Sequence, residues 1–212
     1  MNAKKINSIR ESIFSCGRNE PTDLSAADTE RQDMSEIIFH TCSFYNKNTS
    51  TGRSFQGSKL RNTRFTNCDL SMCNFSFADL FGAEFINCRL IGTTFENASF
   101  SEQLSGKKFF CSGKIENSNL SSANLAGLLL QSCSLRGNRW NDTDIEKADF
   151  SGSDLSGGEF TGICWSDACF TNCDLREALL QGLDIRKVDL SGVRLNSWQI
   201  SQLVSVLGVI VT

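Results

Sequence analysis

The chain has 212 residues, with 21 basic and 24 acidic side chains, a formal net charge of −3, ten cysteines and one proline. This length suits one domain. No apolar run approaches the roughly 20 residues that a bilayer-spanning helix needs, and the first 14 residues lack the apolar core of a signal peptide, so a membrane protein is not expected.

Residues 1–33 show weak repeat character, and we expect them to form an irregular N-terminal segment or cap. Large apolar residues then recur every fifth position from Met34 to Phe44, but Phe55 follows eleven residues later, one more than two repeats. The polar segment between them predicts a loop, and loops inserted in a solenoid commonly carry binding. Its candidate binding residues are Asn46, Lys47, Asn48, Thr49, Ser50, Thr51, Gly52 and Arg53.

From residue 55 to residue 195 every fifth residue is large and apolar, and Ser105 is the only exception among 29 positions. A period of five fits neither an amphipathic helix nor an alternating strand, and it marks a repeat architecture. The residue two places earlier is small, and the residue directly before is usually polar. Two inward residues in five suit one side of a square, so four units would make one coil, stacked on the next like parallel strands roughly 4.8 Å apart. The pattern predicts an all-β, quadrilateral β-helix over residues 34–196.

Glycines suit the corners of such coils because they tolerate unusual turn dihedrals. They are Gly82, Gly92, Gly137, Gly152, Gly157, Gly162, Gly182 and Gly192. Five cysteines share the small inward position, where Cys behaves as a small apolar residue. They are Cys68, Cys73, Cys88, Cys133 and Cys173, whereas Cys164 and Cys169 fall on outward positions. With a single histidine and no CxxC pair, we expect neither a metal site nor a cofactor.

A second interruption covers residues 101–113, and the repeat resumes in frame at Ile115. The glycines within it are spaced wrongly for a phosphate-binding loop. Neutral drift in a tolerant corner and a binding function both remain open from the residues alone. The candidate binding residues are Glu102, Gln103, Leu104, Ser105, Gly106, Lys107, Lys108, Phe109, Phe110 and Cys111.

Charge is unevenly distributed along the chain. Residues 140–190 hold eleven acidic and four basic side chains, a net of −7, whereas residues 1–139 carry a net of +3. An acidic rod attracts basic clefts built for nucleic acid, so we predict an acidic, DNA-mimicking face; the alternative is a set of ordinary solvated positions. The candidate residues are Asp142, Asp144, Glu146, Asp149, Asp154, Glu159, Asp167, Asp174, Glu177, Asp184 and Asp189.

After Leu195 the pattern changes to that of a helix. Ser197 is a candidate cap, apolar residues follow at helical spacing, and Gly208 would end the helix before a short β-prone tail. Such a segment could cover its own coil, but a helix with an apolar strand also suits a two-fold contact, which we favour. We therefore predict a dimerisation module at residues 197–212, with the contact residues Trp198, Ile200, Leu203, Val204, Leu207, Val209, Ile210 and Val211.

Several stretches resemble the Qnr quinolone-resistance branch of the pentapeptide-repeat family, whose members fold as right-handed quadrilateral β-helices. They are residues 67–71, 110–112, 117–121, 138–140, 150–160, 183–190 and 207–208. Both interruptions fall where that branch has a smaller and a larger loop, and the larger loop is the one needed for protection.

The resemblance implies a cytoplasmic bacterial protein that is not an enzyme, forms a homodimer, binds DNA gyrase and topoisomerase IV, and protects them from quinolones. It leaves open whether protection works by DNA mimicry or through loop contacts. The alternative is an interaction module for another basic or nucleic-acid-handling partner. Neither hypothesis involves direct nucleic-acid binding or a membrane. β-Helical acyltransferases have a six-residue repeat and a catalytic histidine, whereas His40 here lies alone before the main repeats.

Overall fold

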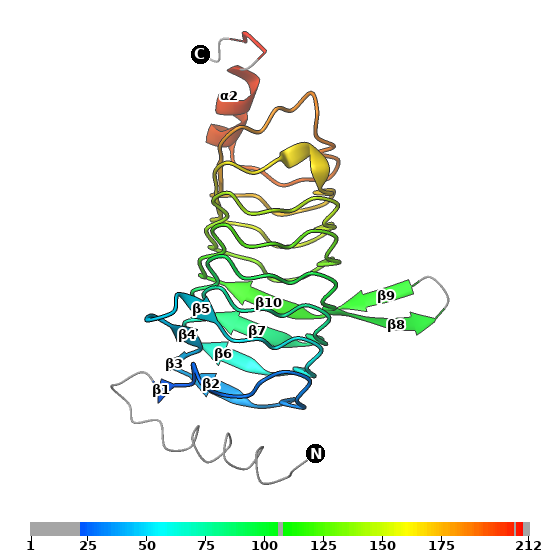
Figure 1. Ribbon diagram of the computed structural model, residues 1–212. Helices are drawn as coiled ribbons and strands as arrows, with labels where there is room; N and C mark the ends of the chain where they lie inside the picture. The colour runs from blue at the N-terminus through cyan, green and yellow to red at the C-terminus, as the bar shows by residue number, and fades with distance from the viewer. Residues whose placement is uncertain (1–21, 106–107, 206, 210–212) are drawn as a thin grey trace.

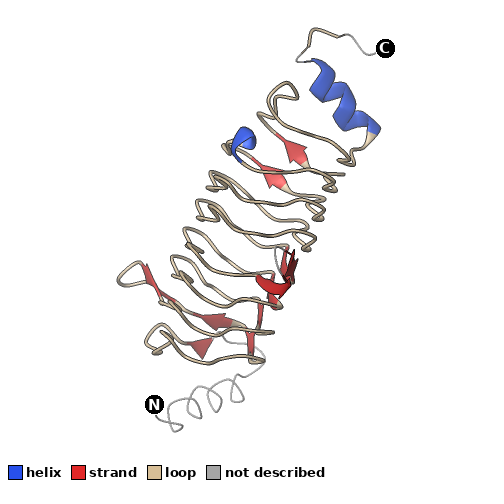
Figure 2. Cartoon of the chain, turned by 90° about the vertical axis from the view of Figure 1, so that its right-hand side faces the viewer, coloured by secondary structure: helices blue, strands red, loops and turns tan. Residues whose placement is uncertain are grey.

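The protein is described by a computed structural model, which covers residues 22–105, 108–205 and 207–209. The described chain forms a rod of stacked four-sided coils, about 7 turns long, with helix α2 at its C-terminal end (Figures 1 and 2). The predicted fold, an all-β right-handed quadrilateral β-helix, is therefore confirmed. None of the helices in the described ranges is long and apolar enough to cross a membrane.

Most strands are only two to five residues long, because each side of the square holds one repeat unit. In chain order they are β1 (Thr22–Asp23), β2 (Ile38–His40), β3 (Cys42–Ser43), β4 (Tyr45–Asn46), β5 (Thr51–Gly52), β6 (Arg64–Thr66), β7 (Ala83–Ile86), β8 (Ser101–Ser105), β9 (Lys108–Cys111), β10 (Gly113–Glu116), β11 (Glu159–Phe160), the 3-10 helix η1 (Trp165–Asp167), β12 (Leu179–Leu180) and α2 (Ser197–Ser205).

Adjacent coils pair in parallel. The longest sheet has the order β10-β7-β6-β2, and Phe39, Phe65, Phe85 and Ile115 stand in register across it. Elsewhere a single bridge joins one coil to the next. We call the four sides A, B, C and D in the order in which the chain runs through them. Their central residues include Phe55, Phe75 and Phe95 on side A, Leu60, Leu80 and Phe100 on side B, Phe65, Phe85 and Ile115 on side C, and Leu70, Leu90 and Leu120 on side D.

Aromatic rings fill the N-terminal half of the core. The ring centroids of Phe55 and Phe75 lie 4.6 Å apart with their planes at 3°, and Phe75 and Phe95 follow at 5.2 Å. From the opposite side C, Phe65 meets Phe75 edge-on at 6.2 Å. Parallel-stacked and edge-to-face pairs are both favourable for ring quadrupoles, so the five-residue period builds one continuous core.

The small inward positions are as predicted. Cys68, Cys73, Cys88, Cys133 and Cys173 are all buried. Burial raises the pKa of Cys73, Cys133 and Cys173 to about 12, so these thiols are neutral at pH 7 and behave as small core residues. Cys164 is exposed and Cys169 is half-buried, in keeping with their outward positions. Among the described residues, no three His, Cys, Asp or Glu side chains gather as metal ligands would.

Most corners are made by a residue in the left-handed region. All eight predicted corner glycines have a positive φ, and asparagine often takes the same position elsewhere, as at Asn97 with φ 54° and Asn117 with φ 51°. Glycine and asparagine are the residues that adopt this conformation most easily. Bulky apolar residues occupy it at two positions, Met72 with φ 57° and Phe77 with φ 59°.

The solenoid begins earlier than residue 34. β1 pairs in parallel with β3, and the side chain of Leu24 is buried. The hydroxyl of Thr29 donates to the carbonyl of Ser54 at 2.5 Å, which ties this segment to the following coil. The N-terminal boundary that we predicted therefore lies inside the first coil. The rest of the predicted cap, residues 1–21, lies outside the described residues.

Candidate interaction surfaces

The first predicted loop is an antiparallel hairpin. β4 and β5 pair through Tyr45 with Gly52 and Asn46 with Thr51. The side-chain oxygen of Asn46 accepts from the backbone N–H of Asn48 at 2.9 Å and fixes the turn. A Cβ on Gly52 would lie 2.3 Å from the backbone carbon of Met72, so only glycine lets the hairpin base approach the next coil this closely. All eight candidate binding residues, 46–53, lie on this hairpin or at its base.

The second predicted loop is a longer antiparallel hairpin, made of β8 and β9. Ser101 pairs with Cys111, and Glu102 pairs with Phe110. Its base is closed by the backbone N–H of Ser112, which donates to the carbonyl of Phe100 at 2.9 Å. Of the predicted binding residues, Gly106 and Lys107 lie outside the described residues, and the others lie on the two strands. Phe110 is exposed, whereas Cys111 is buried at the base.

Arg61 joins the second hairpin to the rod. Its guanidinium donates to Oδ2 of Asp79 at 3.2 Å and to Oε2 of Glu102 on β8 at 3.1 Å. The same group lies over the ring of Phe81, 4.6 Å from its centroid, and Phe81 in turn contacts Phe110 on β9 with centroids 6.0 Å apart. The bond to Asp79 raises the pKa of Arg61. This bracket holds both strands of the hairpin.

We expect Arg61→Ala to loosen the second hairpin without unfolding the rod. Loss of the guanidinium removes the ion pair to β8 and the platform for Phe81, so backbone amides in residues 101–112 should exchange with deuterium faster. Arg64→Ala is a matched control, because Arg64 pairs with Glu84 on side C and not with the hairpin. Mass-spectrometric hydrogen exchange would show the difference, and equal exchange in both variants would contradict the bracket.

The hairpins leave the rod at opposite corners. β4–β5 lies between Phe44 on side D and Phe55 on side A, and β8–β9 lies between Phe100 on side B and Ile115 on side C. Figure 1 shows them projecting from opposite edges of the coil stack. They therefore divide the rod lengthwise into an A–B half and a C–D half.

The predicted acidic residues do not share one side, which corrects the single face that we predicted. The polar position of the unit moves to the next side with every repeat, so acids in it are distributed around the rod. On the C–D half they are balanced by arginines: Arg136 with Asp154 at 3.7 Å, Arg139 with Glu159 at 3.1 Å, and Arg176 with Asp174 at 2.6 Å. Glu177 lies at the corner of this half.

The A–B half is less balanced. Asp142, Asp144, Glu146, Asp149, Asp167, Asp184 and Asp189 lie on it or at its corners. Glu146 pairs with Lys147, and Arg186 lowers the pKa of Asp184 to about 2 by hydrogen bonding. The other five make no ion pair with another described residue. Uncompensated negative charge therefore gathers on the A–B half.

Helix α2 covers the C-terminal end of the rod. Gln199 is 1 % exposed, and its Nε2 donates to the carbonyls of Leu175 and Ala178 at 2.7 and 2.9 Å. Leu203, one turn later, is buried on the same coil. Asn196 caps the helix: its carbonyl accepts from the N–H of Gln199, and its own N–H donates to Gln199 Oε1 at 2.7 Å. The predicted cap, Ser197, is instead the first helical residue.

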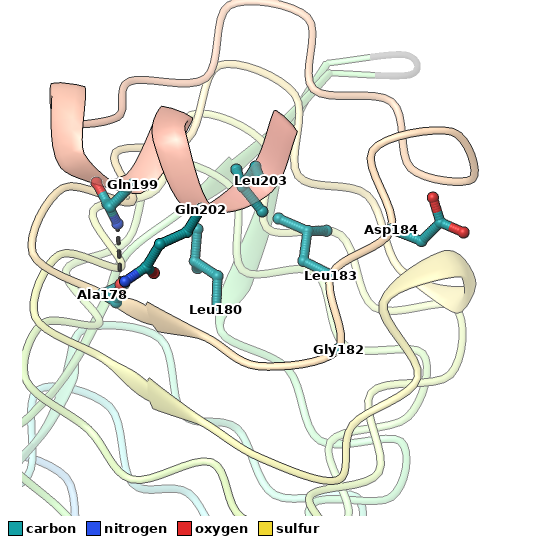
Figure 3. Close-up of a pocket in the computed structure, with 8 residues that line it drawn as sticks. All are labelled: Ala178, Leu180, Gly182, Leu183, Asp184, Gln199, Gln202 and Leu203. Atoms are coloured by element: carbon teal, nitrogen blue, oxygen red, sulfur yellow. Dashed lines mark hydrogen bonds between the residues drawn. The ribbon is translucent and has the colours of Figure 1, made fainter. Parts of the chain in front are cut away.

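The other predicted dimerisation residues lie away from the coil. Trp198, Ile200, Leu207 and Val209 are exposed and Val204 is half-buried, while Ile210 and Val211 lie outside the described residues. Beside them a pocket of about 270 Å³ opens between α2 and the last coil (Figure 3). Its lining includes Leu180, Leu183 and Leu203. An apolar end with an open pocket has the character of an unfilled contact surface.

Sequence reasoning missed Arg61, Phe81, Met72 and Phe77 as candidate surface residues. A signal for the last two was present: they occupy corner positions that this chain usually fills with Gly, Asn or Ser. Arg61 follows Leu60 and Phe81 follows Leu80, which are neighbouring large residues on side B. The five-residue repeat therefore predicts that Arg61 and Phe81 lie at the same corner, one coil apart.

Comparisons with known proteins agree with this geometry. The family model for pentapeptide repeats matches residues 54–85, 78–102, 118–162 and 166–196. The chain is 43% identical over 109 residues to the pentapeptide repeat protein QnrB4 of Escherichia coli, an alignment that covers 51% of each chain. It is 39% identical over 145 residues to the quinolone resistance pentapeptide repeat protein QnrB96 of Scandinavium goeteborgense, covering 68% of this chain and 66% of that one. The matched segments thus span half to two thirds of these relatives.

The likeness extends to a solved structure. Full-length QnrB1, described as a plasmid-mediated fluoroquinolone resistance protein, shares 42% sequence identity with this chain and superposes with a TM-score of 0.82, over 88% of this chain and 85% of that one. The repeat, the rod and these matches lead to one conclusion: the chain belongs to the pentapeptide-repeat family, and the Qnr quinolone-resistance proteins are its homologues.

Proposed function

We propose that this protein binds bacterial DNA gyrase, and topoisomerase IV in the same way, and protects them from quinolones as a non-catalytic dimeric rod. The observation that carries the proposal is the likeness to QnrB1, which combines 42% sequence identity with a shared rod over 88% of this chain. Fold by itself would not support a function, because the same solenoid can serve many roles.

The geometry supports binding through the hairpins. Both hairpins project from the coil stack (Figure 1), and each is held by a specific contact, Gly52 against the next coil and Arg61 against Glu102. A preorganised loop loses less conformational entropy when it binds. The uncompensated acids lie on the A–B half, one of the two halves that the hairpins bound, so a partner that covers this half with a basic DNA-binding surface would meet the acids and both hairpins.

The C-terminal end supports a dimer. Four exposed apolar side chains and a pocket lined by both leucine and polar side chains lie around α2, a surface that a second copy could cover by a two-fold contact. Joining two rods at this end would bring together the two segments of net −7. The centre of the assembly would then be its most acidic part, which suits a partner whose own centre is a basic cleft.

The decisive experiment is a supercoiling assay with purified gyrase and ciprofloxacin. The full chain should restore supercoiling in a concentration-dependent manner at a drug concentration that otherwise blocks it. If no concentration restores activity, the proposed function is wrong. A gyrase-free lysate pull-down that recovers another nucleic-acid-handling protein would then favour the alternative of an unrelated partner.

A further inference from the structure

Exposed apolar side chains are not scattered over the rod. Of the nine large ones in the described part of the chain, five lie at the C-terminal end, Leu179, Trp198, Ile200, Leu207 and Val209. Of the other four, Ile38 lies on side C. Met72, Phe77 and Phe110 are 52, 58 and 53% exposed, and all three lie at the corners that bound sides A and B.

These three residues belong to one level of the rod. Met72 makes the corner before side A, Phe77 makes the corner between A and B, and Phe81 lies at the corner after B, where Phe110 contacts it. The same coil touches both hairpins, because the backbone at Met72 packs against Gly52 and Phe81 packs against Phe110. We call Met72, Phe77, Phe81 and Phe110 the apolar belt.

Neither burial nor local backbone preference explains the belt. Met72 and Phe77 hold the left-handed conformation, which is a genuine outlier for bulky side chains. At equivalent corners the chain uses Gly57, Gly92 and Asn97. A bulky apolar residue that is both strained and more than half exposed is the kind of outlier from which a functional role is inferred.

In the position before each large residue, side A presents short, uncharged side chains at this level, whereas side B carries the ion pair of Arg61 with Asp79. Side A presents Ser54, Asn74 and Thr94 at this level. Side B presents Lys59, Asp79 and Ser99. On the C–D half, long ion-paired side chains cover both sides at this level, Arg64 with Glu84 on side C and Arg89 with Asp69 on side D.

Exposed apolar anchors on either side of the uncharged side A have the composition of the centre of a protein–protein interface. Arg61, at the edge of this surface, is already paired with Asp79 and Glu102, which disfavours its use to neutralise the phosphates of a nucleic acid. Further along the same two sides, Asp144 and Asp149 make no ion pair with another described residue, so an occupant that continues along the rod must be basic there.

We propose that sides A and B, at the level between the hairpins, form the docking surface for a protein, with Met72, Phe77 and Phe110 as its apolar anchors. The occupant is the topoisomerase of the proposed function, on which this inference rests, and it would present apolar pockets beside a basic surface. The inference differs from charge mimicry because the affinity at this level comes from apolar contact and is insensitive to salt.

The double variant Met72→Asn/Phe77→Asn tests this surface. Asparagine is the residue that the chain itself places at Asn97 and Asn117, so the variant should fold with an unchanged or higher melting temperature. Its affinity for purified gyrase, measured by surface plasmon resonance at two salt concentrations, should fall at least tenfold at both. Ile38→Thr removes an equally exposed apolar side chain from side C and should change the affinity less than twofold.

The outcomes separate this inference from the proposed function. If the wild type binds gyrase and the double variant binds equally well, the docking surface is wrong while the proposed function stands. A change in the sedimentation of the double variant alone would also refute the assignment, because the belt would then be a contact between copies. If the wild type does not bind gyrase, the proposed function fails and the occupant assigned here fails with it.

Discussion

A chain that lacks residues 102–111 should remain a folded rod and lose all protection of gyrase from ciprofloxacin. Among the apolar hairpin residues whose burial the structure describes, Phe110 is exposed and Cys111 is buried at the base of the hairpin. Its removal therefore leaves the coils above and below intact. What it takes away is the larger projection of the rod, with Glu102 and Phe110 that the Arg61 bracket holds in place.

The repeat frame fixes how the deletion must be made. Ile115 follows Phe100 by fifteen residues, where direct continuation of the coil needs five, so the insertion is ten residues long. Deleting residues 102–111 joins Ser101 to Ser112 and restores the spacing. Deleting one residue more would leave only three residues between Phe100 and Ile115, where the repeat needs four, and would misalign every following coil.

That longer deletion is a useful control. Removal of residues 102–112 should lower the melting temperature strongly. The corner between sides B and C would be one residue too short, so β10 could not pair with β7 in its parallel register. The in-frame deletion should melt close to the full chain. Supercoiling rescue then compares two folded proteins, and full protection by the in-frame deletion would show that the hairpin has no part in binding.

The sequence was most informative where a side chain faces inward. A strict period of five defines which residues are buried, which are small and which turn, and the structure places Phe55 to Leu175 accordingly. The same period determines the side on which each acid lies, since four units make a coil. The acids at Asp144 and Asp154 could therefore have been assigned to different halves from the sequence alone.

The contacts of the projections were harder to predict. The pairing within each hairpin depends on main-chain hydrogen bonds that no periodicity encodes, and the Arg61 bracket combines groups from residues 61, 79, 81 and 102. The sequence pattern predicted Ser197 as the helix cap, whereas the cap is Asn196, one residue earlier. Asn196 caps the helix with its backbone, while its side chain accepts a hydrogen bond from the N–H of Glu177. Competing local contacts of this kind are not visible in a pattern.

The second large effect should come from the C-terminal end. We expect Ile200→Gln/Leu207→Gln to convert a dimer into a monomer without a loss of fold. Both side chains are 49% exposed, so they stabilise the single chain little, and glutamine retains good helix propensity at Ile200. Sedimentation equilibrium should give about twice the chain mass for the wild type and the mass of one chain, 23.4 kDa, for the variant.

Leu203 separates the two roles of the helix. Leu203 is buried against its own coil. Leu203→Ala should therefore weaken the docking of helix α2 on the last coil by about 2–3 kcal/mol and lower the temperature at which this end of the protein unfolds. Ile200→Gln/Leu207→Gln should melt at the same temperature as the wild type when both proteins are compared as monomers. If the wild type sediments as a single chain even at high concentration, the exposed apolar end has another role, and the acidic segments of two copies do not meet.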